Sequence, residues 1–122
     1  MDEPLSFNNA LQFLVGEQLS SVEFVADYVQ LRFNGPCLTV YTIAQKVAKD
    51  ELAKTWGEPG YCDALCSLIM CTLKQAHVVS NEYLSLTFDD GSVWSVSLRD
   101  EDYRGPEAIY YTDNQRELIY VV

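Results

Sequence analysis

Three cysteines and the only histidine lie close together in the sequence, and their types suggest a metal or redox site: Cys62, Cys66, Cys71 and His77. Thiolates and imidazoles are ligands that zinc prefers in proteins. On a continuous helix, however, Cys71 points about 180° away from Cys62. No second close pair of ligands follows, and the sequence around these residues lacks the basic neighbourhood that a reactive thiolate needs. We therefore expect core cysteines, with a zinc or redox role as the alternative.

No other motif in the chain specifies a reaction. His77 lies in an expected strand, and no Ser-His-Asp or Cys-His arrangement surrounds it. The sequence contains no glycine-rich phosphate loop, no His-Glu-x-x-His and no complete calcium loop. We therefore expect a protein that is not an enzyme, with no catalytic residues, no metal and no cofactor.

Acidic residues gather toward the end of the chain. Residues 89–117 hold 8 acidic and 3 basic side chains, so this quarter carries 8 − 3 = 5 of the ten net negative charges. One interpretation is solvated loops, and the other is an anionic face that steers a basic partner. Tyrosines beside these acids fit an interface core or a domain core equally well. The candidate partner-binding residues are Asp89, Asp90, Asp100, Glu101, Asp102, Tyr103, Arg104 and Glu107.

Composition excludes several classes of protein. The length of 122 residues suits one domain, and a hydrophobic content of 48% argues against disorder. A net charge of −10 argues against direct binding of nucleic acid or anionic membranes, which needs clustered Lys and Arg. The opening Met1-Asp-Glu-Pro4 is acidic, unlike a secretory signal, so we expect a cytoplasmic protein with reduced thiols. The oligomeric state stays open.

The elements that must position these residues occur twice in the sequence. Residues 10–40 and 64–96 share an apolar pattern at an offset of 54 (Leu11 and Leu65), 55 (Leu31 and Leu86) and finally 56. The single-residue slips fall where loops are expected. A match at a fixed period indicates an internal repeat. We expect repeat 1 at about 6–43, an insert at 44–60, repeat 2 at about 61–98 and a C-terminal segment at 99–122.

Each repeat should contain a hairpin whose register follows from its apolar faces. Around Asn34-Gly35, Leu31 pairs with Leu38, and the loop opens to Phe33–Pro36 because Pro36 lacks an N–H. In the second hairpin, a three-residue loop pairs Leu86 with Trp94. That loop also places Gly91 where positive φ is needed. A two-residue loop would mix polar and apolar residues on both faces.

Helices are expected before the first strand of each repeat. The first begins near Ser6 and ends at Gly16. In residues 61–73 the helical spacing predicts a buried stripe of Cys62, Leu65, Cys66, Ile69 and Leu73. Helical spacing also predicts a helix over 45–56, ended by Gly57.

Two short strands are expected at 108–111 and 118–122, around an Asp113-Asn114 turn. The predicted fold class is therefore α+β. Two tandem helix-plus-three-strand modules would form a mainly antiparallel sheet with a pseudo-twofold repeat.

Two motifs resemble segments of small bacterial immunity-type proteins: Gly60-Tyr-x-Asp-Ala-Leu-Cys-x-Leu-Ile69, and Asp90-Gly-Ser-x-Trp-x-Val-Ser-Leu-Arg-x-Glu-Asp-Tyr-x-Gly-Pro-Glu-Ala108. The resemblance covers about the C-terminal half. Proteins of this kind protect a cell from a toxin, such as those of contact-dependent growth inhibition. The resemblance carries no catalytic residues. It implies a cytoplasmic binding protein that neutralises a toxin domain, such as a nuclease, through an acidic surface.

A second binding mode for such a protein is strand addition at an exposed edge, for which the C-terminal strand is the candidate, and it would be nearly indifferent to salt. The rival function is a housekeeping or small-ligand-binding domain with a pocket between the two modules. An enzyme is the third alternative, supported only by scattered carboxylates and thiols.

Overall fold

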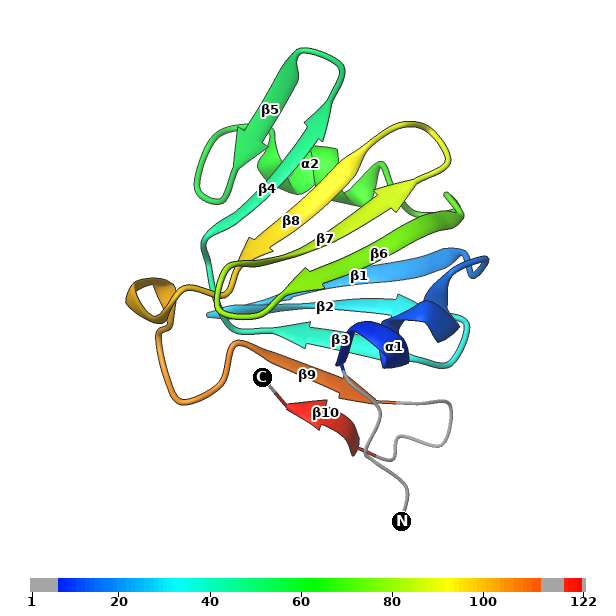
Figure 1. Ribbon diagram of the computed structural model, residues 1–122. Helices are drawn as coiled ribbons and strands as arrows, with labels where there is room; N and C mark the ends of the chain where they lie inside the picture. The colour runs from blue at the N-terminus through cyan, green and yellow to red at the C-terminus, as the bar shows by residue number, and fades with distance from the viewer. Residues whose placement is uncertain (1–6, 113–117, 122) are drawn as a thin grey trace.

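The computed structural model describes residues 7–112 and 118–121, which form a mostly β protein (Figure 1). The helical elements are α1 (Phe7–Leu11), the 3-10 turns η1 (Gln12–Leu14) and η2 (Asp100–Asp102), and α2 (Tyr61–Cys66). The strands are β1 (Leu19–Val25), β2 (Tyr28–Phe33), β3 (Cys37–Val40), β4 (Gln45–Lys49), β5 (Leu52–Thr55), β6 (Leu73–Val79), β7 (Tyr83–Phe88), β8 (Val93–Ser97), β9 (Ile109–Thr112) and β10 (Leu118–Val121).

The strands form two antiparallel sheets, where a single sheet was expected. The first sheet has the order β1-β2-β3-β9-β10, and the second has the order β5-β4-β8-β7-β6. Each contains three consecutive strands and a hairpin from another part of the chain. The hairpin β4–β5 follows β3 but pairs with β8, and β9–β10 follows β8 but pairs with β3. This exchange of hairpins ties the two sheets together.

Both predicted hairpin registers are confirmed. Leu31 pairs with Leu38 across β2 and β3, and the Phe33 N–H donates to the Pro36 carbonyl at 2.8 Å. Leu86 pairs with Trp94 across β7 and β8, and Gly91 has a φ of 88° in its three-residue loop. These registers place the large apolar side chains of each hairpin on one buried face.

The two sheets meet where β1 lies beside β6 (Figure 1). Gln18 and Thr72 form an antiparallel bridge there, flanked by four backbone hydrogen bonds. The bonds run from the N–H of Gly16 to Leu73 O (2.8 Å), Met70 to Leu19 O (2.7 Å), Leu19 to Cys71 O (3.0 Å) and Leu73 to Glu17 O (2.9 Å). The junction between the sheets is therefore a short piece of backbone pairing.

One hydrophobic cluster fills the interior and draws on both sheets and both helices. Its largest fully buried side chains are Trp94, Tyr61, Tyr111, Phe33, Phe88, Leu11, Leu14, Leu19, Leu31, Leu38, Leu65 and Leu68. The shared interior explains why neither sheet leaves an apolar inner face uncovered.

The helix predicted over 45–56 is wrong, because this segment forms the hairpin β4–β5. Val47 pairs with Trp94, and Gln45 with Val96, so β4 gives the outer edge of β8 its partner. Asp50 makes the turn with a φ of 56°. Long-range strand pairing overrides the local helical spacing here. The loss of this helix is also why the chain is mostly β.

The buried stripe predicted on residues 61–73 is right at Leu65 and Leu73, which are fully buried, and wrong at Cys62 and Cys66, which are exposed. Ile69 is partly buried against the core. The helix ends at Cys66, and it also buries Tyr61 and, in the following turn, Leu68. Adjacent residues of a helix point about 100° apart, so a face centred on Tyr61 and Leu65 leaves the two cysteines outside the core. The expectation of core cysteines therefore fails at these two positions.

In the described residues, the helices are all too short to cross a membrane.

Candidate functional site

A groove of about 630 Å³ lies on the outer face of the second sheet. Side chains alternate across a strand, so the residues between the buried ones of β4, β7 and β8 form its floor. These floor residues are Lys46, Ser85, Ser95 and Ser97. Trp56, Glu82, Tyr83, Arg99 and Asp102 also line the groove. The serines on adjacent strands have small side chains, and the longer side chains around them form the walls of the groove.

The acidic turn η2 is anchored at one end of this groove. The Ser97 hydroxyl, at the end of β8, donates to Asp102 Oδ2. The Arg99 N–H donates to Ser97 Oγ at 3.2 Å. Asp100 and Glu101 are exposed beside this anchored carboxylate. Asp102 therefore lines the groove with its carboxylate held by the floor, and the exposed Asp100 and Glu101 precede it in the same turn.

The next predicted residues turn toward the first sheet. Tyr103 is half-buried against the core, and its burial and the charge of Asp100 raise its pKa. The Arg104 guanidinium lies 3.5 Å from the Asp27 carbonyl in the β1–β2 turn, within hydrogen-bonding distance. Glu107 lines a small cavity of about 200 Å³ with Asp27 and Tyr41. The segment 99–108 thus borders two different surfaces.

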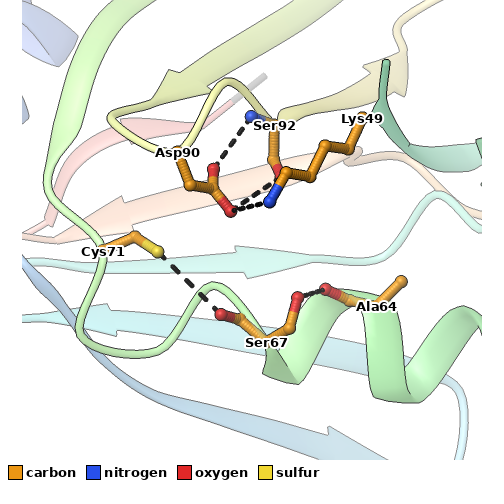
Figure 2. Close-up of polar contacts among 6 residues, drawn as sticks. All are labelled: Lys49, Ala64, Ser67, Cys71, Asp90 and Ser92. Carbon is orange, nitrogen blue, oxygen red and sulfur yellow. Dashed lines mark hydrogen bonds and ion pairs between the residues drawn. The ribbon is translucent and has the colours of Figure 1, made fainter. Parts of the chain in front are cut away.

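Asp89 and Asp90 lie at the other end of β8, in the β7–β8 loop (Figure 1). Asp90 Oδ1 accepts the Ser92 N–H at 2.8 Å, and Oδ2 accepts the Ser92 hydroxyl at 3.0 Å (Figure 2). Lys49 Nζ lies 3.6 Å from Asp90 Oδ2. Partial burial opposes ionisation of Asp90, but the Ser92 hydrogen bonds and Lys49 outweigh it and lower the pKa.

The structure therefore places Asp100, Glu101 and Asp102 in one turn, of which Asp102 lines the groove, and it separates them from Asp89 and Asp90 by the length of β8. Asp90 is bonded to Ser92 of its own loop and paired with Lys49 of β4, whereas Asp89, which also contacts Cys71, and the acids Asp100 and Glu101 are exposed.

The cysteines and the histidine do not assemble into one site. Across residues 7–112 and 118–121, no three His, Cys, Asp or Glu side chains are placed to hold a metal ion. Cys71 Sγ lies 3.9 Å from the Ser67 carbonyl, as Figure 2 shows. Burial raises the pKa of Cys71 and of Cys66. His77 is exposed on β6, with its ring 6.2 Å from that of Tyr83.

Sequence reasoning missed the floor of the groove. Ser85, Ser95, Ser97 and Lys46 are outward residues of strands, and each taken alone is typical of a solvated face. The available signal was the serine pattern of β7 and β8, where outward positions hold small side chains on both paired strands. Lys46 could not be found, because its segment was predicted to be a helix.

No protein-family model matches the chain, and neither a curated protein nor a solved structure does.

Proposed function

We propose that this protein is a non-enzymatic binding protein that receives a basic segment of another protein in the groove of the second sheet. The observation that carries the proposal is the position of η2, in which Asp102 lines a groove of about 630 Å³ and directly follows the exposed acids Asp100 and Glu101. The segment 99–108 also lies outside both predicted repeats.

The dimensions and chemistry of the groove support binding of a peptide segment or side chains. Its volume of about 630 Å³ lies within the range of about 300–1,000 Å³ that is usual for binding sites. Serine hydroxyls on its floor can donate to or accept from a bound backbone. Lys46 and Arg99 also line the groove, so the bound segment should offer carbonyl or carboxylate acceptors beside its basic side chains.

The specific form of the proposal is a cytoplasmic immunity protein that neutralises a toxin domain, such as a nuclease. A nuclease must bind a polyanion in a basic cleft. Exposed Asp100 and Glu101 on a chain of net charge −10 would be attracted to such a cleft and exclude the substrate.

Toxin neutralisation can be tested by growth rescue. If the neighbouring gene encodes a large secreted protein, the probe is the C-terminal domain of that protein, expressed in a bacterial host with and without this chain. Rescue of growth, together with a complex of the two purified proteins, supports the immunity role. A toxic domain that kills equally in both cultures would exclude this toxin as the target.

The acidic rim is tested by charge reversal in the same complex. Asp100→Lys with Glu101→Lys should slow association at least about tenfold at low salt, because charge steers encounter. The control compares two single charge reversals: Asp100→Lys in η2, and Asp89→Lys at the far end of β8. Only Asp100→Lys should slow association. Equal association rates for the two single variants would exclude the rim as the contact.

We also propose that the two halves of the chain arose by duplication and are related by a pseudo-twofold axis through the Gln18–Thr72 bridge. The bonds around that bridge support this, because they fall into pairs at one offset: Gly16 and Met70 (70 − 16 = 54), and Leu19 and Leu73 (73 − 19 = 54). Superposing residues 7–40 on 61–96 in an experimental structure tests this. Helices or strands that fail to coincide would exclude it.

The alternative function is a small-ligand-binding domain with a pocket between the modules. A recess of about 270 Å³ does lie at the junction, between Phe24 of β1 and Trp56 and Tyr61. This volume is below the usual range for ligand pockets, which favours an occupant the size of one side chain. A metabolite retained in native mass spectrometry of the purified protein would favour the alternative.

A further inference from the structure

Helix α2 carries two cysteines that are open to solvent. Cys62 and Cys66 are both exposed, although cysteine is among the residue types most often buried in proteins. Neither belongs to the hydrophobic cluster, and the described residues give neither thiol a hydrogen bond. Packing therefore explains neither side chain, and the chemistry of the thiols is the property that distinguishes them.

The two thiols lie one helical turn apart. Residues four apart in an α-helix differ in direction by about 40° and have Cβ atoms about 5–6 Å apart. Both positions lie inside α2, and the Ser67 N–H donates to the Asp63 carbonyl at 2.9 Å, so the helical path continues past Cys66. Burial, and after it the charge of Cys62, raise the pKa of Cys66, which fits two thiols that are close enough to interact.

Cys71 lies in a different environment. Its Sγ is 3.9 Å from the Ser67 carbonyl, and the acidic side chains that act on it belong to the β7–β8 loop. None of the charges that act on Cys66 comes from Cys71. Cys62 and Cys66 therefore form a pair of thiols that Cys71 does not join.

The number of thiols decides which metal ions the pair can hold. A structural zinc site uses four protein ligands, and across residues 7–112 and 118–121 no three suitable side chains come together. Soft thiolate ligands select Cu(I), an ion that is satisfied by two thiolates on opposite sides of it. With metal–sulfur bonds of about 2.3 Å, as for zinc, the two sulfurs would be about 4.6 Å apart, which side chains one turn apart can span.

We infer that Cys62 and Cys66 form a binding site for one Cu(I) ion, with a thiolate on either side of it. Binding forms two copper–sulfur bonds and releases the two thiol protons to water, and the ion keeps its oxidation state. The lining of the groove on the second sheet contains neither cysteine, so the inference does not depend on the function proposed for that groove.

Competition with the Cu(I) chelator bicinchoninate, without oxygen and with ascorbate as the reductant, measures the affinity. The parent should take up one Cu(I) per chain. Cys62→Ser and Cys66→Ser should each weaken binding at least about a hundredfold, because only the parent can add the second sulfur within the same molecule. Cys71→Ser is the control and should bind as the parent does. Single variants of Cys62 and Cys66 that bind as tightly as the parent would overturn the inference.

A matched variant keeps the number of thiols and moves one of them. Ser67 is exposed and has helical angles, with φ −65° and ψ −14°, so Cys66→Ser with Ser67→Cys turns the second thiol by about 100°. This protein should bind Cu(I) as weakly as Cys66→Ser alone. An affinity equal to that of the parent would mean that the spacing of the two thiols is irrelevant, and the inference would fail.

Alkylation by iodoacetamide locates the bound ion. One equivalent of Cu(I) should slow the reaction of Cys62 and Cys66 at least about tenfold, because the thiolate is the nucleophile and a bound sulfur is not free to react. The rate at Cys71 should not change. Native mass spectrometry of the same sample should show one ion in a monomer. Protection of Cys71 in place of the pair, or an ion held between two chains, would contradict a site built on one helix.

Discussion

The inner faces of the two sheets share one pattern of strand pairing but differ in polarity. In the first sheet Leu38 lies between Leu31 and Tyr111, and in the second Trp94 lies between Leu86 and Val47. Ile109 faces Val40 in the first sheet, where Gln45 faces Val96 in the second.

The second sheet contains a buried chain of hydrogen bonds. Trp94 Nε1 donates to the Tyr61 hydroxyl at 3.1 Å, which donates to Gln45 Oε1 at 2.7 Å. Gln45 Nε2 donates to the Thr42 carbonyl at 2.7 Å. Burial raises the pKa of Tyr61, so its hydroxyl keeps the proton that it donates.

The comparison shows that the second sheet keeps the strand pairing of the first but adds a buried hydrogen-bond network to its interior. The network connects α2, β4 and β8. β4 forms a hairpin with β5, and Trp56 follows β5 directly, with its N–H bonded to the Gln45 carbonyl. A buried polar chain is stable only when its members are satisfied, and it then fixes their relative positions. The groove therefore lies on the sheet whose hairpin has directional bonds in addition to apolar packing.

The largest expected effect is at Trp94. Trp94→Ala should lower the free energy of unfolding by about 3–5 kcal/mol, because it opens a cavity and removes the donor to Tyr61. Leu38→Ala, at the matching place in the first sheet, should cost about 2–3 kcal/mol. Urea denaturation measures both. Equal losses would mean that the network adds nothing to the packing.

Tyr61→Phe removes only the hydroxyl. We expect a loss of about 2 kcal/mol, because Gln45 Oε1 and Trp94 Nε1 both lose a buried partner. Tyr41→Phe, on the outer face of the first sheet, is the control and should stay within about 0.5 kcal/mol of the parent. Thermal unfolding of the three proteins shows whether the two hydroxyls differ as stated.

The connectors between helix and strand differ at the residue that adopts a positive φ. Gly16 has a φ of 96°, and Met70 has a φ of 80° at the corresponding place. Met70 is 71% exposed, so Met70→Gly loses little packing and should raise stability by about 0.5–1 kcal/mol. Gly16→Ala should lower it by about 1 kcal/mol through backbone strain, since nothing lies within 4 Å of the added carbon. A destabilised Met70→Gly protein would show that the Met70 side chain has a role that its exposure does not suggest.

The smallest expected effect is at Asp90. Its pKa is lowered in the folded protein, so its contribution to stability is present above the normal carboxyl range and is lost as pH falls through the lowered value. Asp90→Asn should therefore reduce stability at pH 7 by less than about 1 kcal/mol and flatten the fall in acid. Urea midpoints at pH 7 and below pH 4 check this, with Asp89→Asn as control. An unchanged acid slope would assign the fall to other carboxyl groups.

Local patterns in the sequence were sufficient for the hairpins. The pairings of Leu31 with Leu38 and of Leu86 with Trp94, and the loop at Gly91, follow from side-chain alternation and turn chemistry over fewer than a dozen residues. The acidic character of segment 99–108 is likewise visible without coordinates.

Only the tertiary structure decided where the hairpins β4–β5 and β9–β10 pair, which helical face holds Cys62 and Cys66, and which acids share a surface. The apolar residues of 45–56 have helical spacing, yet the segment forms two strands, because β4 pairs with the edge of β8 and β5 pairs with β4. The groove results from such long-range pairing. Backbone groups must find partners across the whole chain, and a local pattern records only the neighbours within its own segment.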